Sequence, residues 1–329
     1  LKMKKIAIIG GKGFIGTRLS QRLSSNKKLF DIYDIDSQLI GTKNWLDVRK
    51  IETLDSLKGA DTLINLAAEH KDNIKPVSRY DETNVKGAEN ICTIATKYNI
   101  NEIIFTSSVA VYGFAPSNTG EDGEINYFND YGRTKYLAEK VYLKWQKEDP
   151  QNRKLTIIRP TVVFGEGNRG NVFNLLKQIQ SKKFLMIGDG KNIKSMAYVE
   201  NVAAFLEYSL EFKKNLSIYN YIDKPDMNMN ELISLTRNIL FDKNNTGLRL
   251  PKVLGLAVGY LVDIFQNFSN YEFPISSIRI KKFLSTSQFS TSVEDTGFRR
   301  PVSMENALKK TIRYEFFEDN RDKEVFFTE

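Results

Sequence analysis

The sequence contains one histidine, His70, and one cysteine, Cys92, among its 329 residues. A single histidine excludes a metal site built on two or more imidazoles, and we expect no metal in this protein. A single cysteine excludes an intrachain disulfide and is typical of a reducing compartment. The chain has no run of the roughly 18 to 20 apolar residues that a membrane-spanning helix needs. The apolar run near its start stops at Gly10 and is too short for a signal peptide. These absences favour a cytoplasmic protein.

The composition is that of a globular protein, with 41% hydrophobic and 27% charged residues, and it argues against disorder. The length fits one large domain or two smaller ones. The net charge of +8 indicates an anionic partner, which is a nucleic acid, a phosphate compound or an acidic membrane surface. No motif that combines aromatic and basic residues for nucleic-acid recognition is present, and we expect no nucleic-acid partner.

A glycine-rich turn lies near the start of the chain, between a predicted strand and a predicted helix. The strand is expected at Lys5–Ile9, Gly10, Gly13 and Gly16 follow it, and the helix is expected from Thr17 to Ser25. The first glycine allows a tight turn, the second lets the backbone approach a pyrophosphate, and the third lets the helix pack against the strand. The N–H groups at the start of the helix are then available to phosphate oxygens. The pattern favours a dinucleotide site over a glycine turn without a ligand.

An acidic residue lies near the end of the second predicted strand, Leu29–Ile35. Asp34 follows Gly10 by 24 residues. A carboxylate at this place hydrogen-bonds the ribose 2′-hydroxyl and repels a 2′-phosphate. We therefore expect NAD rather than NADP.

Strands and helices continue to alternate, with strands expected at Thr62–Ala68 and Glu102–Ser107 and a helix at Ala88–Tyr98. The alternation predicts an α/β fold with a Rossmann-like, doubly wound parallel sheet. Because ligands of such sheets bind at the carboxyl ends of the strands, Asp47 and Val48 are expected near the adenine. The middle of the cofactor is expected near Ala67, Ala68, Glu69 and His70. His70 then either orients the substrate or makes a structural hydrogen bond, and we expect Cys92 to pack in the core.

Three residues have the chemistry of a proton-transfer site. Tyr131 and Lys135 are four residues apart on a helix expected from Tyr131 to about Lys147, so they share one face. A cation beside a phenol lowers the pKa of the phenol from about 10, and the phenolate is then a general base for an alcohol. Ser108, which follows a predicted strand, is placed to hydrogen-bond the same oxygen. An isolated Tyr-x-x-x-Lys pair is more often a solvated helix face, but here it follows a dinucleotide motif.

With these motifs the sequence resembles the extended short-chain dehydrogenase/reductase family, in its nucleotide-sugar epimerase/dehydratase branch. The segments Asn84–Gly87 and Arg159-Pro160 add to the resemblance. It implies that Ser108, Tyr131 and Lys135 are catalytic, and that the protein is a homodimer built through helices. It implies an NAD site that consists of Gly10, Gly13, Phe14, Ile15, Gly16, Asp34, Asp47, Val48, Leu66, Ala67, Ala68, Asn84, Ser107, Tyr131, Lys135 and Pro160.

The two residues after the catalytic serine distinguish the reactions of this branch. The 4,6-dehydratases of the family carry an Asp-Glu pair there, whereas this chain has Val109 and Ala110, which move no proton. We therefore expect C4 epimerisation, in which the sugar is oxidised to a 4-keto form, turns over in the site and is reduced again. A 4-keto-sugar reductase that uses NAD(P)H is the alternative, and a non-catalytic dinucleotide-binding regulatory protein is a more distant one.

The substrate side of the sequence departs from the pattern of enzymes that act on UDP-sugars. An apolar residue near Val162 replaces an asparagine that contacts the diphosphate, and Lys194 replaces an arginine. The sequence is more similar to the 4-epimerases that act on N-acetylglucosamine linked through a diphosphate to undecaprenol, in O-antigen or related glycan assembly. UDP-linked and lipid-linked substrates both stay open. The residues expected to bind the substrate are Glu69, His70, Ser108, Asn168, Arg169, Asn171, Lys194 and Arg279.

A run of apolar residues at Val253–Phe268 contains one charge, Asp263, and has basic residues on both sides. It is too short to span a bilayer. It is either a helix buried in the substrate domain, which we favour, or an interfacial helix whose basic neighbours contact anionic lipid headgroups on the inner face of the membrane.

The motifs divide the chain into two expected domains. Residues 1–163 and 196–223 are expected to form the NAD-binding domain, and residues 164–195 and 224–329 a smaller α/β substrate domain. The charged tail after Phe317 is expected to be loosely ordered.

Overall fold

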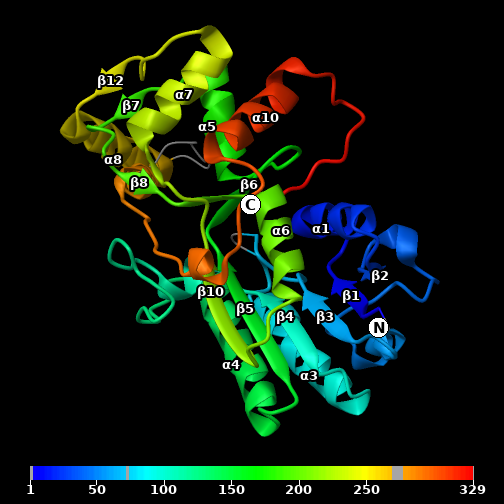
Figure 1. The fold of residues 1–329 in the computed structure, drawn as a ribbon. Coiled ribbons are helices and arrows are strands. Elements are labelled where there is room, and N and C mark those ends of the chain that lie inside the picture. Colours follow the sequence, from blue (N-terminus) through cyan, green and yellow to red (C-terminus); the bar gives the residue numbers. More distant parts are fainter. Residues whose placement is uncertain (1–2, 72–73, 269–276, 329) are drawn as a thin grey trace.

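The computed structural model describes residues 3–71, 74–268 and 277–328. Its centre is a parallel six-stranded sheet with strand order β10-β5-β4-β3-β1-β2 (Figure 1). The strands are β1 (Lys5–Ile9), β2 (Leu29–Tyr33), β3 (Thr62–Asn65), β4 (Glu102–Thr106), β5 (Lys154–Pro160) and β10 (Leu216–Tyr221). The α/β fold expected from the alternating pattern is confirmed.

Helices cover both faces of the sheet, α3 (Gly87–Lys97) and α4 (Asp130–Glu148) on one face and α1 (Phe14–Ser25) and α6 (Val199–Ser209) on the other. Strand β1 supplies apolar side chains to both layers, because successive residues of a strand point to opposite faces. Ala7 and Ile9 belong to the core beneath α3 and α4, and Ile6 and Ile8 to the core beneath α1 and α6.

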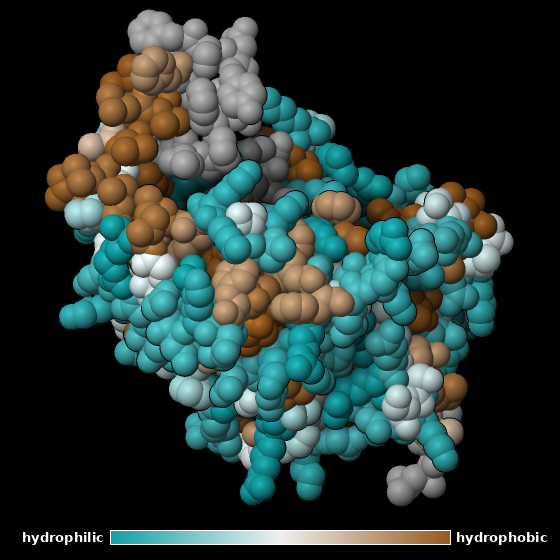
Figure 2. Space-filling model, turned by 90° about the horizontal axis from the view of Figure 1, so that it is seen from above, coloured by the Kyte–Doolittle hydropathy of each residue, from teal (hydrophilic) through white to brown (hydrophobic). Residues whose placement is uncertain are grey.

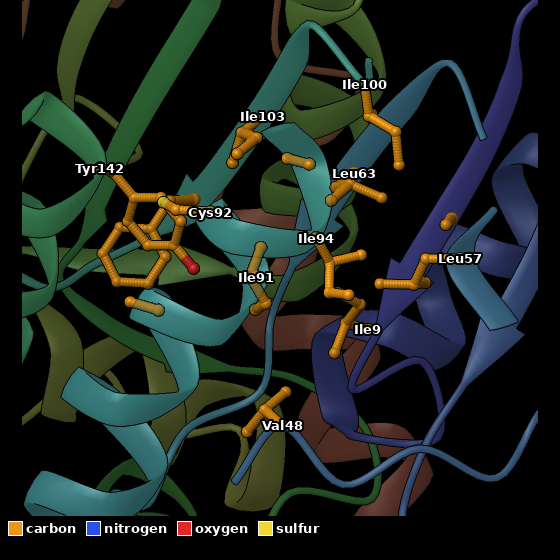
Figure 3. Close-up of a cluster of buried hydrophobic side chains, with 14 of the residues drawn as sticks. Ile9, Val48, Leu57, Leu63, Ile91, Cys92, Ile94, Ile100, Ile103 and Tyr142 are labelled. Carbon is orange, nitrogen blue, oxygen red and sulfur yellow. The ribbon is translucent and has the colours of Figure 1, made fainter. Parts of the chain in front are cut away.

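Cys92 is buried in the layer beneath α3 and α4, as predicted, and lies beside Tyr142 (Figure 3). Burial raises the pKa of its thiol, so the side chain stays neutral and acts as a small apolar residue.

After β2, which is the edge strand, the chain crosses over to the opposite side of β1. Beyond β2 the edge continues only as an isolated parallel bridge between Asp34 and Trp45, and the chain then returns to form β3 on the opposite side of β1. The carboxyl ends of β1 and β3 therefore flank the point where the strand order reverses, which is where open α/β sheets bind their ligands.

The rest of the chain forms a group of helices above the carboxyl ends of the sheet (Figure 1). They are α5 (Asn171–Gln180), α7 (Met229–Phe241), α8 (Lys252–Phe268), α9 (Ser277–Leu284) and α10 (Met304–Phe317). Short strands pair among them: β6 (Val162–Phe164) with β9 (Met196–Tyr198), β7 (Met186–Ile187) with β12 (Arg249–Leu250), and β8 (Ile193–Lys194) with β11 (Met227–Asn228). Of the helices in the described part of the chain, none has the length and hydropathy that crossing a bilayer requires.

The expectation of a loosely ordered tail is wrong for the residues up to Thr328. Phe326 packs against Phe14, with 5.5 Å between the ring centroids. The backbone N–H of Phe326 donates to Gly167, and its carbonyl accepts from Arg169. The charged composition of this segment gave no sign that Phe326 would pack against Phe14, which is distant in the sequence.

The expectation that residues 253–268 form a buried helix is also wrong. The segment is helical as predicted, but Val253, Leu261 and Phe265 are 77%, 57% and 66% exposed. The helix packs on its neighbours through glycines: a Cβ on Gly255 would lie 2.5 Å from Ile187, and one on Gly259 would lie 2.9 Å from the Cα of Ser277. The glycine face of α8 is therefore covered by its neighbours, and the large apolar side chains of the helix lie on its exposed outer face.

A buried ion pair joins α4 to β5. Nε and Nη2 of Arg159 donate to the two carboxylate oxygens of Glu139 at 2.9 and 2.7 Å, and both side chains are almost completely buried. The Nη1 group of Arg159 also donates to the Tyr112 hydroxyl at 2.6 Å. A buried guanidinium keeps its charge and therefore depends on this one carboxylate.

We predict that Glu139→Gln destabilises the fold by roughly 3–5 kcal/mol, since it leaves a buried cation without its anion. The Asp319–Arg321 pair has side chains 68% and 86% exposed, so Asp319→Asn is a matched control with no measurable effect. Urea unfolding of the three proteins measures the difference. Equal stabilities would contradict the assigned role of this pair.

Candidate active site

The glycine turn after β1 is packed tightly on one side and open on the other. Gly10 has a φ of +78°, and a Cβ there would lie 2.7 Å from the backbone nitrogen of Ala67. A Cβ on Gly16 would lie 2.5 Å from the carbonyl oxygen of Gly10, but one on Gly13 meets only that oxygen, at 3.3 Å. The turn therefore seats α1 against β1 and the end of β3, and leaves the space beside Gly13 open.

The start of α1 faces this open side. The helix begins at Phe14, three residues earlier than predicted, with Gly13 as its N-cap and no side chain that caps its N–H groups. The first N–H groups of a helix have no partner within it. Phe14 and Ile15 thus contribute donors where a pyrophosphate is expected.

Asp34 lies directly after β2, which ends two residues earlier than predicted. Its carboxylate accepts a hydrogen bond of 3.0 Å from the backbone of Lys12, so the acid and the glycine turn are joined. Partial burial raises the pKa of Asp34. The side chain is half-buried beside the turn, which places it where a ribose hydroxyl is expected.

The loop at Asp47 and Val48 is held against α3. Burial raises the pKa of Asp47, but the hydrogen bonds and charge of Arg49 outweigh it and bring the pKa below its usual value. The carbonyl of Val48 accepts from Asn90 at 2.8 Å, and a Cβ on Gly87 would lie 2.8 Å from the Val48 side chain. This loop forms a fixed wall next to the switch point of the sheet.

Asn84 lies in a short π-helical segment, Asp81–Lys86, which continues into α3. Its amide accepts from the backbone nitrogen of Glu69 at 2.9 Å and donates to the Glu69 carbonyl at 3.0 Å and to the Thr134 hydroxyl at 2.9 Å. These bonds fix the segment after β3 to α4.

His70 and Glu69 follow the end of β3. The Glu69 carboxylate forms an ion pair of 3.0 Å with Arg79. The Nδ1 atom of His70 lies 3.3 Å from the Ala68 carbonyl, and burial lowers the pKa of the ring, which favours the neutral imidazole. Its other nitrogen, Nε2, is buried and has no hydrogen-bond partner within the described part of the chain.

The three predicted catalytic residues come together at the carboxyl end of β4. Lys135 is 2% exposed, and its ammonium donates to the Thr106 carbonyl at 2.6 Å and lies 4.4 Å over the ring of Phe105. Ser108 follows two residues after Thr106, and its hydroxyl hydrogen-bonds Tyr131. The base candidate, its cation and the hydroxyl donor therefore share one strand end and one helix.

The predicted decrease in the pKa of Tyr131 is not found. Burial raises the pKa of its phenol to about 12, and the Ser108 hydrogen bond opposes this shift. Burial also lowers the pKa of Lys135 to about 7, so the ammonium that was expected to lower the phenol pKa is itself destabilised. The spacing of four residues predicted the shared face but not the cost of desolvating both groups.

Three of the buried polar atoms that have no hydrogen-bond partner among the described residues lie at this edge of the sheet. They are the hydroxyl of Thr106, which ends β4, the hydroxyl of Ser107, which follows it, and Nε2 of His70, which comes after β3. Such atoms are rare in folded proteins and call for a ligand or ordered water. Together with the open helix start and Asp34, they fit the polar groups of NAD. Leu66, Ala67 and Ala68 line the same edge, half-buried, and Pro160 closes the end of β5.

Several predicted substrate-binding side chains are engaged with other parts of the protein. Asn168 is 2% exposed and donates to Thr328 at 2.9 Å. Arg169 forms an ion pair of 2.8 Å with Glu315 of α10. Both side chains belong to the segment between β6 and α5. Asn168 attaches this segment to the tail, and Arg169 attaches it to α10.

The remaining predicted donors lie around α5 and α9. Asn171 is exposed at the start of α5 and Arg279 is exposed on α9. The ammonium of Lys194 donates to the Lys282 carbonyl at 2.8 Å, and burial lowers its pKa to about 8. Lys194 therefore ties β8 to the end of α9.

Two groups that complete the site were absent from the sequence prediction: the Thr106 carbonyl and the Thr134 hydroxyl. A carbonyl oxygen carries no signal in the residue type, and Thr134 is unremarkable until Asn84, fifty residues earlier, lies against it. The only hint was the place of both residues next to predicted catalytic ones.

We predict that Gly13→Ala keeps the fold but loses the cofactor. The new methyl group meets only one backbone oxygen, so stability falls by less than about 1 kcal/mol, while the methyl occupies the expected path of the pyrophosphate. Gly16→Ala is the matched comparison, with an expected loss of about 1–3 kcal/mol from overpacking. Thermal unfolding and the NAD released on denaturation measure both. A Gly13→Ala protein with a full NAD content would contradict the placement of the pyrophosphate.

Comparison with known proteins agrees with this geometry. Residues 6–221 match the model of the NAD dependent epimerase/dehydratase family. The chain is 42% identical to the N-acetyl-alpha-D-glucosaminyl-diphospho-ditrans,octacis-undecaprenol 4-epimerase of Escherichia coli O157:H7, over 98% of this chain and 99% of that protein.

Solved structures show the same fold. The UDP-glucose 4-epimerase of Thermotoga maritima, solved with UDP-glucose, has a TM-score of 0.70 at 19% identity, over 94% of this chain and 98% of that one. The Thermus thermophilus UDP-glucose 4-epimerase in complex with NAD has a TM-score of 0.69 at 16% identity, with the same coverage. On the family match and the end-to-end similarity, the chain belongs to the NAD dependent epimerase/dehydratase family.

Proposed function

We propose that this protein inverts C4 of an N-acetylhexosamine that is linked through a diphosphate to undecaprenol, and so interconverts the GlcNAc and GalNAc forms in surface polysaccharide or O-antigen biosynthesis. The observation that carries the proposal is the group of Ser108, Tyr131 and Lys135 at the end of β4, followed by Val109 and Ala110, which move no proton. The 42% identity to an epimerase named for that lipid-linked sugar supports the choice of substrate.

NAD is the cofactor of the enzyme, and its nicotinamide supplies a hydride acceptor and donor at C4. The residues of the chain handle the proton. The Tyr131 phenolate takes the proton of the 4-hydroxyl, and the Ser108 hydroxyl donates to the same sugar oxygen. The 4-keto sugar turns over in the site, so C4 regains hydride on its other face. Tyr131 returns the proton to the C4 oxygen, which completes an isomerisation with no net change in oxidation.

Lys135 has two tasks in this scheme. Its ammonium is anchored on the Thr106 carbonyl, which holds the side chain at the carboxyl end of β4. Its positive charge favours the phenolate once the site is filled. The Glu139 carboxylate, one turn further along α4, raises the pKa of Lys135 against the larger lowering by burial.

We assign the cofactor to residues 1–163 and 196–223 and the sugar diphosphate to residues 164–195 and 224–329. Within the second part, Asn171 and Arg279 are the exposed polar candidates for the diphosphate, and His70 reaches the sugar from the first part. The half-buried Asp34 beside the turn favours NAD over NADP, and with it an epimerase over a reductase that uses NADPH.

The function is tested by separate incubations with undecaprenyl-diphospho-GlcNAc and UDP-GlcNAc, without added cofactor, and analysis of the sugar for GalNAc. We expect conversion of the lipid-linked sugar and a slower conversion of UDP-GlcNAc. Equal or faster conversion of UDP-GlcNAc would assign the protein to the UDP-sugar 4-epimerases. A requirement for added NADH or NADPH would assign it to the reductases.

We predict that Tyr131→Phe lowers turnover of the preferred sugar at least about 100-fold, because the general base is lost. Tyr136→Phe, on the same helix, is the matched control and keeps the wild-type rate. Both variants should retain bound NAD. Survival of full activity in Tyr131→Phe would disprove the mechanism.

We predict that Ser108→Ala moves the rising limb of the pH–rate profile to higher pH. The Ser108 hydrogen bond lowers the pKa of Tyr131. Its removal raises that pKa, so a higher pH is needed to form the phenolate. Ser108→Thr keeps a hydroxyl and is expected to restore the profile. Profiles of kcat between pH 6 and pH 10 for the three proteins measure this, and an unshifted limb in Ser108→Ala would contradict it.

We also propose that the outer face of α8 binds the inner face of the cell membrane. The apolar patch consists of Leu248, Val253, Leu254, Val258, Tyr260, Leu261, Ile264, Phe265 and Ile278, each at least 45% exposed. Figure 2 shows the apolar surface gathered over α8 at one end of the molecule. Lys252, Lys281 and Lys282 are exposed around it. An apolar helix face with basic residues at its border is typical of interfacial helices on anionic lipid.

We predict that the protein floats with vesicles that contain phosphatidylglycerol, and less with vesicles of phosphatidylcholine alone or at high salt. Val253→Ser, Leu261→Ser and Phe265→Ser together should abolish flotation, since they remove three of the most exposed side chains of the patch. Ile40→Ser, which changes a residue 66% exposed outside the patch, is the control. Wild-type flotation by the triple variant would disprove the contact.

A homodimer built through helices is the assembly that we propose from the family resemblance. The molar mass of the purified protein in solution, measured by light scattering, tests this assembly.

A further inference from the structure

Two aromatic side chains lie exposed and paired outside every core of the protein. Phe114 is 72% exposed and Phe128 is 50% exposed, and their ring centroids are 4.6 Å apart. Large apolar side chains that gather on a surface mark a binding site more often than single ones do. Neither the cofactor site nor the apolar patch includes this pair.

The pair is connected to the catalytic residues by short segments. Phe128 precedes Tyr131 by three residues, so their Cα atoms are at most about 11 Å apart. Phe114 follows Ser108 through one turn of 3₁₀ helix, Val109–Tyr112, and Gly113. The Cα atoms that carry the two rings are therefore close along the chain to those of Ser108 and Tyr131.

The two segments that carry the rings are packed against each other. Gly113 has a φ of +61°, and a Cβ there would lie 2.0 Å from the carbonyl oxygen of Asn126. The backbone nitrogen of Asn126 donates to Val111 at 3.1 Å. A Cβ on Gly132 would lie 2.4 Å from the carbonyl oxygen of Ala110. These backbone contacts thus fix the segments that carry the two rings relative to the segments that carry Ser108 and Tyr131.

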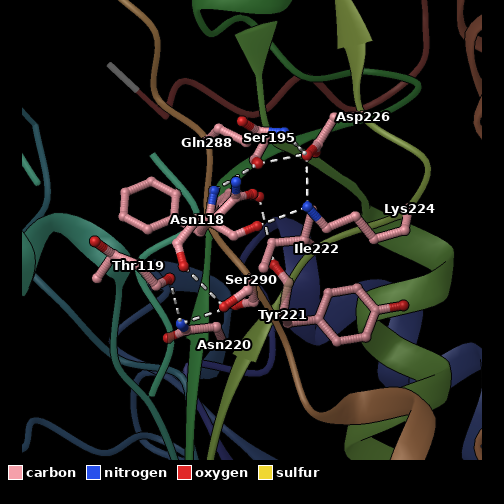
Figure 4. Close-up of polar contacts among 12 residues, drawn as sticks. Asn118, Thr119, Ser195, Asn220, Tyr221, Ile222, Lys224, Asp226, Gln288 and Ser290 are labelled. Carbon is pink, nitrogen blue, oxygen red and sulfur yellow. Dashed lines mark hydrogen bonds and ion pairs between the residues drawn. The ribbon is translucent and has the colours of Figure 1, made fainter. Parts of the chain in front are cut away.

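The same loop is joined to α9. Lys282 lies over the ring of Phe128, with 5.6 Å between its ammonium and the ring centroid. The chain after α9 is bonded to the loop: Asn118 donates from its backbone to Gln288 at 2.8 Å, and Ser290 donates to Thr119 at 3.0 Å (Figure 4). Because α9 packs on α8 and Lys282 of α9 lies over Phe128, α9 connects the aromatic pair to the helix that carries the apolar patch.

We propose that Phe114 and Phe128 bind the first isoprenyl units of the lipid-linked substrate, between the catalytic site and the membrane. This rests on the proposed function. The substrate presents a sugar, an acidic diphosphate and an apolar chain in that order. The protein presents its catalytic hydroxyls, then the ammonium of Lys282 beside the aromatic pair, then the apolar patch on α8. The pair thereby selects for a prenyl chain over the polar nucleoside of a UDP-sugar.

Two water-soluble substrates test this without membranes: GlcNAc diphosphate esterified with geraniol, which carries two isoprenyl units, and the corresponding methyl ester. We expect the wild-type enzyme to show a KM at least tenfold lower for the geranyl ester at a similar kcat. The double variant Phe114→Ser, Phe128→Ser should lose this preference and keep its kcat for the methyl ester. Phe317→Ser, which changes a Phe 61% exposed on α10, is the control and keeps the preference.

The outcomes separate this inference from the proposed function. A wild-type enzyme that converts only UDP-GlcNAc would overturn both. Conversion of the prenyl esters with the same geranyl preference in the double variant would overturn the inference alone. An equal rise in the KM for UDP-GlcNAc and for the geranyl ester in the double variant would also overturn it, because the rings would then contact a part common to both substrates. Thermal unfolding confirms that each variant is folded.

Discussion

The ammonium of Lys135, buried against the Thr106 carbonyl, is the contact on which the site depends. It ties α4 to the end of β4 and places Tyr131, one turn earlier, at Ser108. Holding an ammonium in a buried place is costly, and here burial brings its pKa to about 7. The surrounding fold offsets this cost through further contacts along the same helix.

Those contacts recur along successive turns of α4. Thr134 accepts from Asn84, Glu139 pairs with Arg159 of β5, and Tyr142 accepts from Asn65 at the end of β3. The partners come from three different parts of the chain. The helix is therefore fixed along its length against the sheet, and the catalytic face has one position relative to the strand ends. Rigid support of this kind is what a base needs when it transfers a proton over a hydrogen-bond distance.

The apolar side chains of the sheet and those of α8 are used in different ways. In the sheet domain they fill the layers on either side of the strands, as for Ile6 and Ile9 in β1. Around α8 they remain on the surface, because glycines at 255 and 259 bring the helix so close to its neighbours that only its inner face is covered. A lipid-linked substrate gives a reason for both the exposed patch and the aromatic pair near the catalytic residues.

The sequence by itself determined the fold class and the cofactor and predicted the catalytic group, because each depends on local spacing. The spacing of Gly10, Gly13 and Gly16 indicates the turn without reference to the rest of the chain. Tyr131 and Lys135 share a helix face because they are four residues apart, independently of the elements that pack against the helix. The exposure of α8 and the contacts of Arg169 and Lys194 with Glu315 and the end of α9 were decided only by the tertiary structure. The shifted pKa of Tyr131 was decided there too. Burial and pairing depend on which distant segments meet, and an apolar or basic residue type is compatible with several partners until the chain is folded.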